Sequence, residues 1–254
     1  MTVRQQAIAV GRICYFNGIL PLYRSPILIA AVFLTPFSFL FFLKIVAAPG
    51  FFPYGVVGGV LFTVLFTGNG MLNDCAYLRL ERQLQQVFVA SPVRPLSYVL
   101  GMALSELAFA TPALALFLGI LALVHPIGAL GLLALLGVAL LTWLLASSLG
   151  FLLSTFFRQL REIWPIATLV FSLLSVVPPI FYPISVLPAP VQWVAFLAPS
   201  TFASQLADRA AGLPGAPALS PPFLGNVYFQ VGTLILLTLL FALAALKLAR
   251  WREP

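Results

Sequence analysis

Glu106 is the residue whose chemistry stands out in this sequence, because it is a carboxyl group inside a long apolar segment. It lies nine positions after Ser97, which is roughly 13 Å along a helix at 1.5 Å per residue. A charge at that depth in a membrane costs about 2.5–3.5 kcal/mol and normally faces a helix bundle or water. Two interpretations follow: a structural hydrogen bond to a Ser, Thr or Asn of another helix, or a polar point in a transport path.

No other set of residues predicts catalysis or metal binding. The sequence lacks the G-x-x-x-x-G-K-[ST] loop that holds ATP phosphates. His125 is the single histidine, which excludes a two-histidine metal site. Asp74 and Asp208 are expected on opposite sides of a membrane, which argues against a paired-aspartate protease, and no Ser–His set converges. We therefore expect no catalytic residues, no metal site and no cofactor bound by this chain.

The composition predicts an integral membrane protein that positions Glu106 on a spanning helix. Apolar residues make up 62% of the 254-residue chain and charged residues only 7%, whereas a soluble domain carries roughly 25% charged residues. The net charge of +7 is spread thinly between apolar segments, so nucleic acid is not an expected partner. Cys14 and Cys75 are too few for a disulfide framework.

Six segments are long and apolar enough to cross a bilayer, which takes about 20 residues of helix. They are residues 26–47, 54–73, 97–124, 128–157, 163–182 and 227–249. Lys and Arg mark the cytoplasmic side. With a cytoplasmic N-terminus only Lys44 and Arg209 lie outside, so both termini are expected in the cytoplasm.

The domain organisation follows from these spans. Residues 1–25 form a cytoplasmic or interfacial segment, in which 3–24 is either an amphipathic helix at the headgroups or a plain anchor. Residues 26–249 form one six-span domain, and residues 250–254 a cytoplasmic tail. The segment 183–225 is rich in proline, and its apolar pieces are too short to span, so we expect extracellular re-entrant half-helices between the fifth and sixth spans.

The loop at 77–95 contains a predicted amphipathic helix at 77–90. Leu80, Leu84, Val87 and Phe88 recur at helical spacing, while polar side chains occupy the opposite face. Ser91-Pro92 ends it, because a residue that precedes proline avoids helical geometry. The pattern alone leaves two interpretations open, a solvated connecting helix and a helix that docks on a partner.

The same loop resembles the signature of ABC-2 family permeases, the membrane subunits of type-2 ABC exporters. The resemblance lies in Leu80-Glu81-Arg82, Gln85, Val87, Ser91-Pro92-Val93 and Leu100-Gly101. The Pro-rich stretch 181–202 is similar to the family's segment between the fifth and sixth spans. The family's usual lysine after that glycine is Met102 here, so no role of that lysine carries over.

The resemblance implies a dimer of six-span subunits, expected to be a homodimer, in a prokaryotic inner membrane. Two separate ABC ATPase subunits would bind ATP and magnesium on the cytoplasmic side. The 77–90 helix would be the coupling helix that contacts the ATPase. The residues expected to make that contact are Arg79, Glu81, Arg82, Gln85, Gln86 and Phe88.

The expected function is export of a hydrophobic or amphipathic small molecule, because SPVRPLSYVLG (91–101) looks like the multidrug and lipid-like exporter branch. The alternative within the family is a lipid-linked polysaccharide. A different class, an ion-coupled secondary transporter, usually carries several ionisable residues inside the membrane and often repeats. Here Lys44 and Lys247 lie at the ends of predicted spans, Glu106 is the one charged residue deep inside a span, and no repeat is evident.

Overall fold

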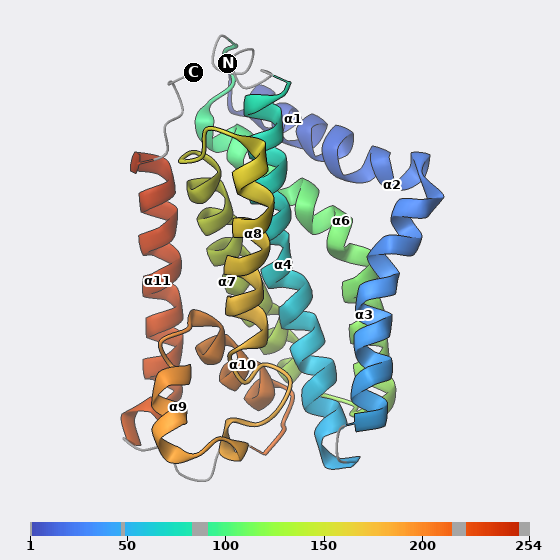
Figure 1. Cartoon of the computed structure of the whole chain (residues 1–254), viewed down its shortest axis with the longest axis vertical. Coiled ribbons are helices and arrows are strands. Elements are labelled where there is room, and N and C mark those ends of the chain that lie inside the picture. Colours follow the sequence, from blue (N-terminus) through green and yellow to red (C-terminus); the bar gives the residue numbers. More distant parts are fainter. Residues whose placement is uncertain (1, 47–48, 83–90, 215–221, 249–254) are drawn as a thin grey trace.

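The structure of the chain, a computed structural model, describes residues 2–46, 49–82, 91–214 and 222–248 (Figure 1). These residues are almost entirely helical and contain no strand. The α-helices are α1 (Val3–Cys14), α2 (Leu20–Arg24), α3 (Pro26–Val46), α4 (Phe52–Leu80), α6 (Pro95–Val124), α7 (Ala129–Ser154), α8 (Leu160–Val176), α9 (Ala189–Ala195), α10 (Pro199–Ala210) and α11 (Val227–Leu248). A π-helical turn (Tyr15–Ile19) joins α1 to α2, and 3₁₀ turns lie at Pro49–Phe51, Ile184–Val186 and Pro222–Gly225.

Four of these helices, α4, α6, α7 and α11, are long and apolar enough to cross a membrane. Helices α3, with 21 residues, and α8, with 17, occupy the first and fifth predicted spans. The prediction of an all-helical membrane protein is therefore confirmed for the described residues. The count of six spans and their orientation stay predictions.

Proline and local propensity explain most of the helix boundaries. Pro26, Pro53 and Pro95 each lie in a first turn, where a missing N–H costs nothing. Helix α4 continues past the predicted end at residue 73 to Leu80, because its last turns contain Ala, Leu and Arg, which are good helix formers. Helix α8 stops at Val176, short of the predicted residue 182, since Pro178-Pro179 follows.

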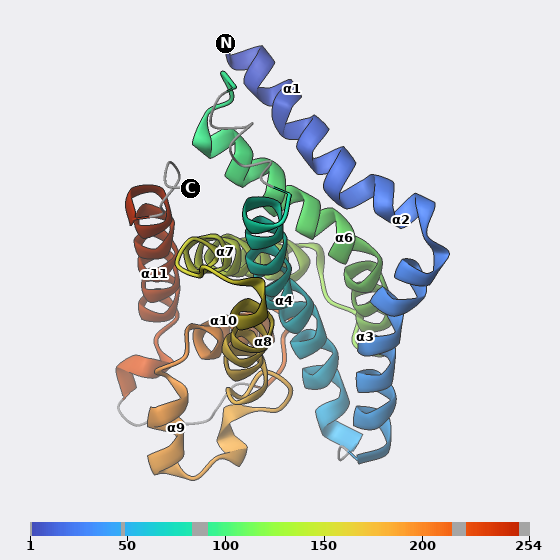
Figure 2. The same cartoon turned by 45° about the horizontal axis from the view of Figure 1, so that its top comes forward.

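Helix α4 is the centre of the bundle and packs against α6, α7 and α8 (Figure 2). Its most apolar stretch is 72% buried within the chain, against 22% in α6 and α11. Small residues allow the close crossing of α4 and α7: a Cβ placed on Gly150 would collide with the backbone of Gly68. Because α4 lies inside the bundle, polar side chains on this helix are shielded from lipid.

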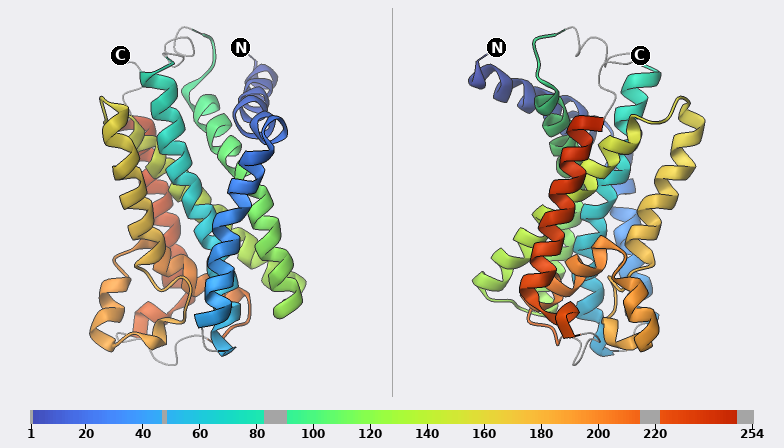
Figure 3. Two further views of the ribbon diagram at one scale, coloured as in Figure 1. Left: turned by 45° about the vertical axis from the view of Figure 1, so that its right-hand side comes forward. Right: turned by 90° about the vertical axis from the view of Figure 1, so that its left-hand side faces the viewer.

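The amino end of α1, the carboxyl end of α4 and the carboxyl end of α11 lie at one end of the molecule, here called the α1 end. Helix α1 lies across the axis of the bundle (Figure 3). It packs on α6, with Ile13 against Gly101 and the turn at Gly18 against Ser105. Residues 3–24 are helical throughout, and their position relative to the headgroups stays a prediction.

Helices α9 and α10 lie at the opposite end, here called the α9 end, and have 7 and 12 residues, too few to span. Helix α10 is buried against α7, α11 and α4. The Ser204 hydroxyl donates to the Pro179 carbonyl oxygen at 2.8 Å, and His125 Nε2 lies 2.9 Å from the Ala211 carbonyl oxygen. Two short helices are present as predicted, and their re-entrant, extracellular placement stays a prediction.

Candidate functional site

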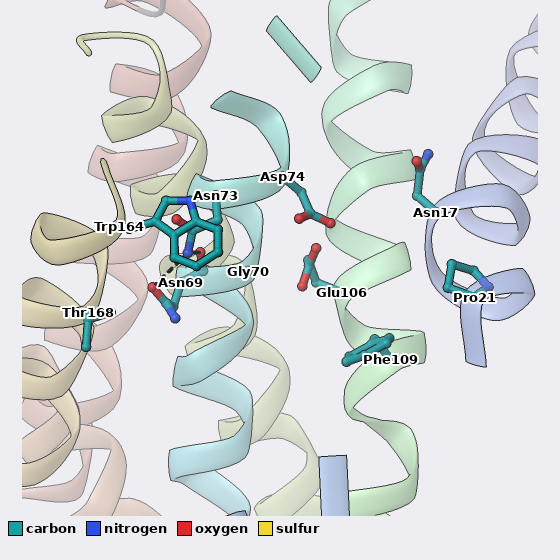
Figure 4. Close-up of a pocket in the computed structure, with 10 residues that line it drawn as sticks. All are labelled: Asn17, Pro21, Asn69, Gly70, Asn73, Asp74, Glu106, Phe109, Trp164 and Thr168. Carbon is teal, nitrogen blue, oxygen red and sulfur yellow. Dashed lines mark hydrogen bonds between the residues drawn. The ribbon is translucent and has the colours of Figure 1, made fainter. Parts of the chain in front are cut away.

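A cavity of about 550 Å³ lies beside α4, on the side of the bundle where α6, α8 and the turn between α1 and α2 approach it (Figure 4). Its volume falls in the range of small-molecule sites, about 300–1,000 Å³. It is lined by Asn17, Pro21, Asn69, Gly70, Asn73, Asp74, Glu106, Phe109, Trp164 and Thr168. We call it the central pocket.

Two carboxyl groups meet in the central pocket, Asp74 from α4 and Glu106 from α6. Their side chains point toward one another across the space between the two helices in Figure 4. Glu106 is partly buried and Asp74 is exposed toward the pocket.

Gly70, one turn before Asp74 on α4, makes room for this pair. A Cβ built at Gly70 would collide with the Glu106 carboxyl group. The glycine therefore lets the Glu106 side chain lie directly on the α4 backbone. Close approach of two helices at a glycine is common in membrane bundles, and here it brings a carboxyl group to the second helix.

The amide groups of α4 extend the polar side of the pocket. Asn73 Nδ2 donates to the backbone oxygen of Asn69 at 2.9 Å and to its Oδ1 at 3.2 Å. The Oδ1 atom of Asn73 is buried and accepts no hydrogen bond from any described residue. Buried acceptors are usually satisfied, so an acceptor without a donor is unusual at this position.

Aromatic side chains supply the apolar side. Phe109 follows Glu106 by three residues on α6 and therefore shares its face. Trp164, on the first turns of α8, is 70% exposed, and Thr168 lies one turn further along the same helix. The pocket thus combines a few convergent polar groups with aromatic surface, the usual composition of a site for an organic ligand.

Arg79, at the last turn of α4, binds the end of α7. Its guanidinium donates to the carbonyl oxygens of Thr155 at 3.0 Å and Ser154 at 2.7 Å, and also to that of Phe157. The last carbonyl groups of a helix have no partner within it, so Arg79 satisfies acceptors at the end of α7 and just beyond it. The structure places this predicted coupling residue inside the chain's own packing.

Glu81 and Arg82 follow directly and are both exposed at the α1 end. Arg82 Nε donates to the Tyr77 hydroxyl at 3.0 Å, and its guanidinium lies over the same ring. The predicted contact residues Gln85, Gln86 and Phe88 fall outside the described residues. No observation tests the predicted contact itself.

The loop after this segment is attached to α1. Gln6 is buried, its Nε2 donates to the Pro92 carbonyl oxygen at 2.9 Å, and its Oε1 accepts from the Arg94 backbone N–H at 3.1 Å. One side chain therefore holds the exit of the 77–95 loop on the helix that lies across the bundle. The described residues contain no cluster of three or more His, Cys, Asp or Glu side chains fit for a metal.

Comparison with known families decides what kind of membrane protein this is. The ABC-2 type transporter family matches residues 11–207, which is well over half of the chain. The chain belongs to the ABC-2 type transporter family. No curated protein matches the chain. The family resemblance seen in the 80–101 segment is thereby confirmed, whereas the multidrug and lipid-like branch stays a prediction.

As an ABC-2 permease, the chain is a transport component that pairs with an ABC ATPase subunit. Its central pocket is therefore a candidate part of the transport path. The sequence identified Glu106 but missed Asp74, because the predicted second span ended at residue 73. The spacing of Asn69, Asn73 and Asp74 on one side of a glycine-containing apolar helix is the signal that indicates this polar surface. The side chain that Glu106 points toward is a carboxyl group rather than the Ser, Thr or Asn of the structural interpretation (Figure 4).

Proposed function

We propose that this permease is the membrane subunit of an ATP-driven exporter. It moves a hydrophobic or amphipathic small molecule, drug-like or lipid-like, from the cytoplasm or the inner leaflet outward. The observation that carries the proposal is the central pocket: a chain of this family has a cavity of about 550 Å³ with aromatic and polar lining against its most buried helix. That volume suits a small organic molecule.

The energy for transport comes from ATP, which the partner ATPase subunits bind. Two ATPase subunits bind ATP and magnesium at the α1 end, which is the cytoplasmic end in this proposal, and two copies of the permease form a homodimer. ATP binding shifts the population between arrangements of the dimer only to the extent that ATP favours one of them. This chain performs no chemistry on the nucleotide.

The contacts of Arg79 support a path of coupling between the ATPase and the central pocket. Glu81 and Arg82, two and three residues after Arg79, are exposed and belong to the segment proposed to contact the ATPase. Because the Arg79 guanidinium binds three carbonyl groups at the end of α7, a displacement of that segment moves the ends of α4 and α7 together. Helix α4 carries Asp74 of the central pocket, so the movement reaches the substrate.

Two other functions compete with this one. The first is export of a lipid-linked polysaccharide by the same kind of machine. The second is an ion-coupled secondary transporter, and the Asp74–Glu106 pair is the observation that favours it, since such carriers use intramembrane carboxyl groups. Family membership favours the ATP-driven machine.

The experiment is purification of the tagged permease from its native membrane, followed by reconstitution into liposomes with every protein that co-purifies. We expect an ABC ATPase at one copy per permease and transport of a fluorescent amphipathic probe that stops without ATP. Matched liposomes with AMP-PNP, or with a proton gradient and no nucleotide, are the controls. Transport driven by the proton gradient alone would overturn the proposal in favour of the ion-coupled carrier.

A further inference from the structure

We propose that the central pocket binds the protonated amino group of its substrate, so that the transported molecule is an amphipathic organic cation held by Asp74 and Glu106. The inference rests on the proposed function for the direction of transport and adds the chemical class of the cargo. It concerns the residues of the pocket and does not depend on which nucleotide state drives transport.

The charge of the lining is the first argument. Both ionisable side chains that line the pocket are acidic, and no Lys or Arg is among its lining residues. Arg79, further along α4, donates to carbonyl groups at the end of α7. Among the described residues, the two carboxyl groups therefore have no Lys or Arg beside them in the pocket lining.

Hydrogen-bond geometry is the second argument, and it does not depend on the acidic pair. Asn73 lines the same cavity, and its Oδ1 is a buried acceptor with no donor among the described residues. A protonated primary amine has three N–H donors and no acceptor. Asp74 and Glu106 offer acceptors from two helices, and Asn73 adds an amide group that can accept at Oδ1 and donate at Nδ2.

The aromatic lining is the third argument. Trp164 and Phe109 belong to α8 and α6, and both line the pocket that contains the carboxyl groups. An aromatic face attracts a cation within about 6 Å of its centre, and tryptophan attracts it most strongly. The remaining aromatic surface packs against the apolar part of an amphipathic molecule. A bare inorganic cation has no apolar part that could make this contact.

The decisive experiment compares two probes that differ only in charge. Dansylcadaverine carries a primary ammonium, and its N-acetyl derivative is neutral with the same dansyl group and chain. Binding of each to the wild-type permease with its co-purified ATPase, in dodecyl maltoside without nucleotide, is followed by fluorescence anisotropy. We expect the cationic probe to bind about tenfold more tightly or better, as a charge-assisted hydrogen bond provides. Equal affinities would overturn the proposal, and this comparison requires no variant.

Isosteric variants test whether Asp74 and Glu106 cause the preference for the cationic probe. Asp74→Asn and Glu106→Gln should each reduce the preference for the cationic probe, and the double variant should bind both probes within about threefold of each other. Asp208→Asn is the matched control, because it removes one carboxyl group at the α9 end, away from the pocket, and should keep the full preference. A double variant that elutes as a single species and keeps the wild-type preference would refute the assignment.

One further arm identifies the source of the amine. Phosphatidylethanolamine, whose headgroup carries a primary amine, is added to the micelles at constant probe concentration. Competition with dansylcadaverine in the wild type indicates a lipid headgroup as the natural cargo, and absence of competition indicates a free organic amine. Because these measurements need no ATP, loss of ATPase association would contradict the proposed function while leaving the charge preference of the pocket intact.

Discussion

Arg79 binds the backbone of Thr155: the guanidinium of the last turn of α4 donates to that carbonyl oxygen at 3.0 Å, directly after the end of α7. Two neighbouring carbonyl groups, of Ser154 and Phe157, accept from the same side chain. The two helices are also the ones that cross closely at Gly68 and Gly150. A single side chain thus joins the proposed ATPase-facing segment to the interior of the bundle.

Arg79→Lys should destabilise the permease by about 2 kcal/mol, because an ammonium cannot reproduce the planar set of donors that reaches three carbonyl groups. The measurement is the unfolding midpoint in detergent by tryptophan fluorescence. Arg82→Lys is the control, since that exposed arginine donates only to the Tyr77 hydroxyl among the described residues, and it should change stability by less than about 0.5 kcal/mol. Equal effects of the two substitutions would contradict the role given to Arg79.

Exchanging the charges of Glu81 and Arg82, as Glu81→Arg with Arg82→Glu, should lower ATPase co-purification about tenfold and leave permease stability unchanged. Both side chains are exposed, so the fold loses no buried contact, while a complementary surface on the ATPase would meet reversed charges. The same exchange at the exposed neighbours Arg161 and Glu162 is the control, because it lies on α8 at the same end. If both exchanges retain the ATPase, the proposed contact is wrong.

Gly150→Ala should destabilise the fold by about 1–3 kcal/mol, because the new methyl group would collide with the Gly68 backbone and push α4 from α7. Gly119→Ala, on α6, has no atom within 4 Å of the added Cβ and should stabilise the helix by about 0.5–1 kcal/mol. Thermal unfolding of both variants in the same detergent gives the comparison. Similar midpoints for the two would show that the crossing tolerates a larger separation.

Hydropathy and proline positions predict most of this fold, because long apolar runs and helix starts are local properties of the sequence. The end of α4 could not be predicted in the same way: Asp74 and Arg79 look like loop residues until their partners Glu106 and Thr155 are known. Those partners lie on other helices, and a single sequence does not pair them. The amphipathic pattern of 77–90 likewise could not show that Tyr77–Leu80 continue α4.

Asp208 gives a prediction of pH dependence. It lies on α10, outside the candidate spans, is buried, and its Oδ1 accepts no hydrogen bond from a described residue. Burial raises the pKa of this carboxyl group well above its ordinary value, so the folded chain favours the protonated form. Its contribution to stability is therefore complete below the pKa of the unfolded chain, about 3.9, and is lost as the pH rises through the raised pKa of the folded chain. The Asp208→Asn variant has no carboxyl group at this position, so its stability does not fall with rising pH for this reason.

The unfolding midpoint of Asp208→Asn should consequently exceed that of the wild type by an amount that grows as the pH rises above about 3.9, the pKa of the unfolded carboxyl group. Taking the difference between the two proteins at each pH cancels the titration of every group that does not interact with Asp208. Tyr54, which does interact with it, is a phenol that ordinarily ionises near pH 10, above the range of the measurement. A difference between Asp208→Asn and the wild type that does not vary with pH would mean that this carboxyl group keeps its ordinary pKa in the folded permease.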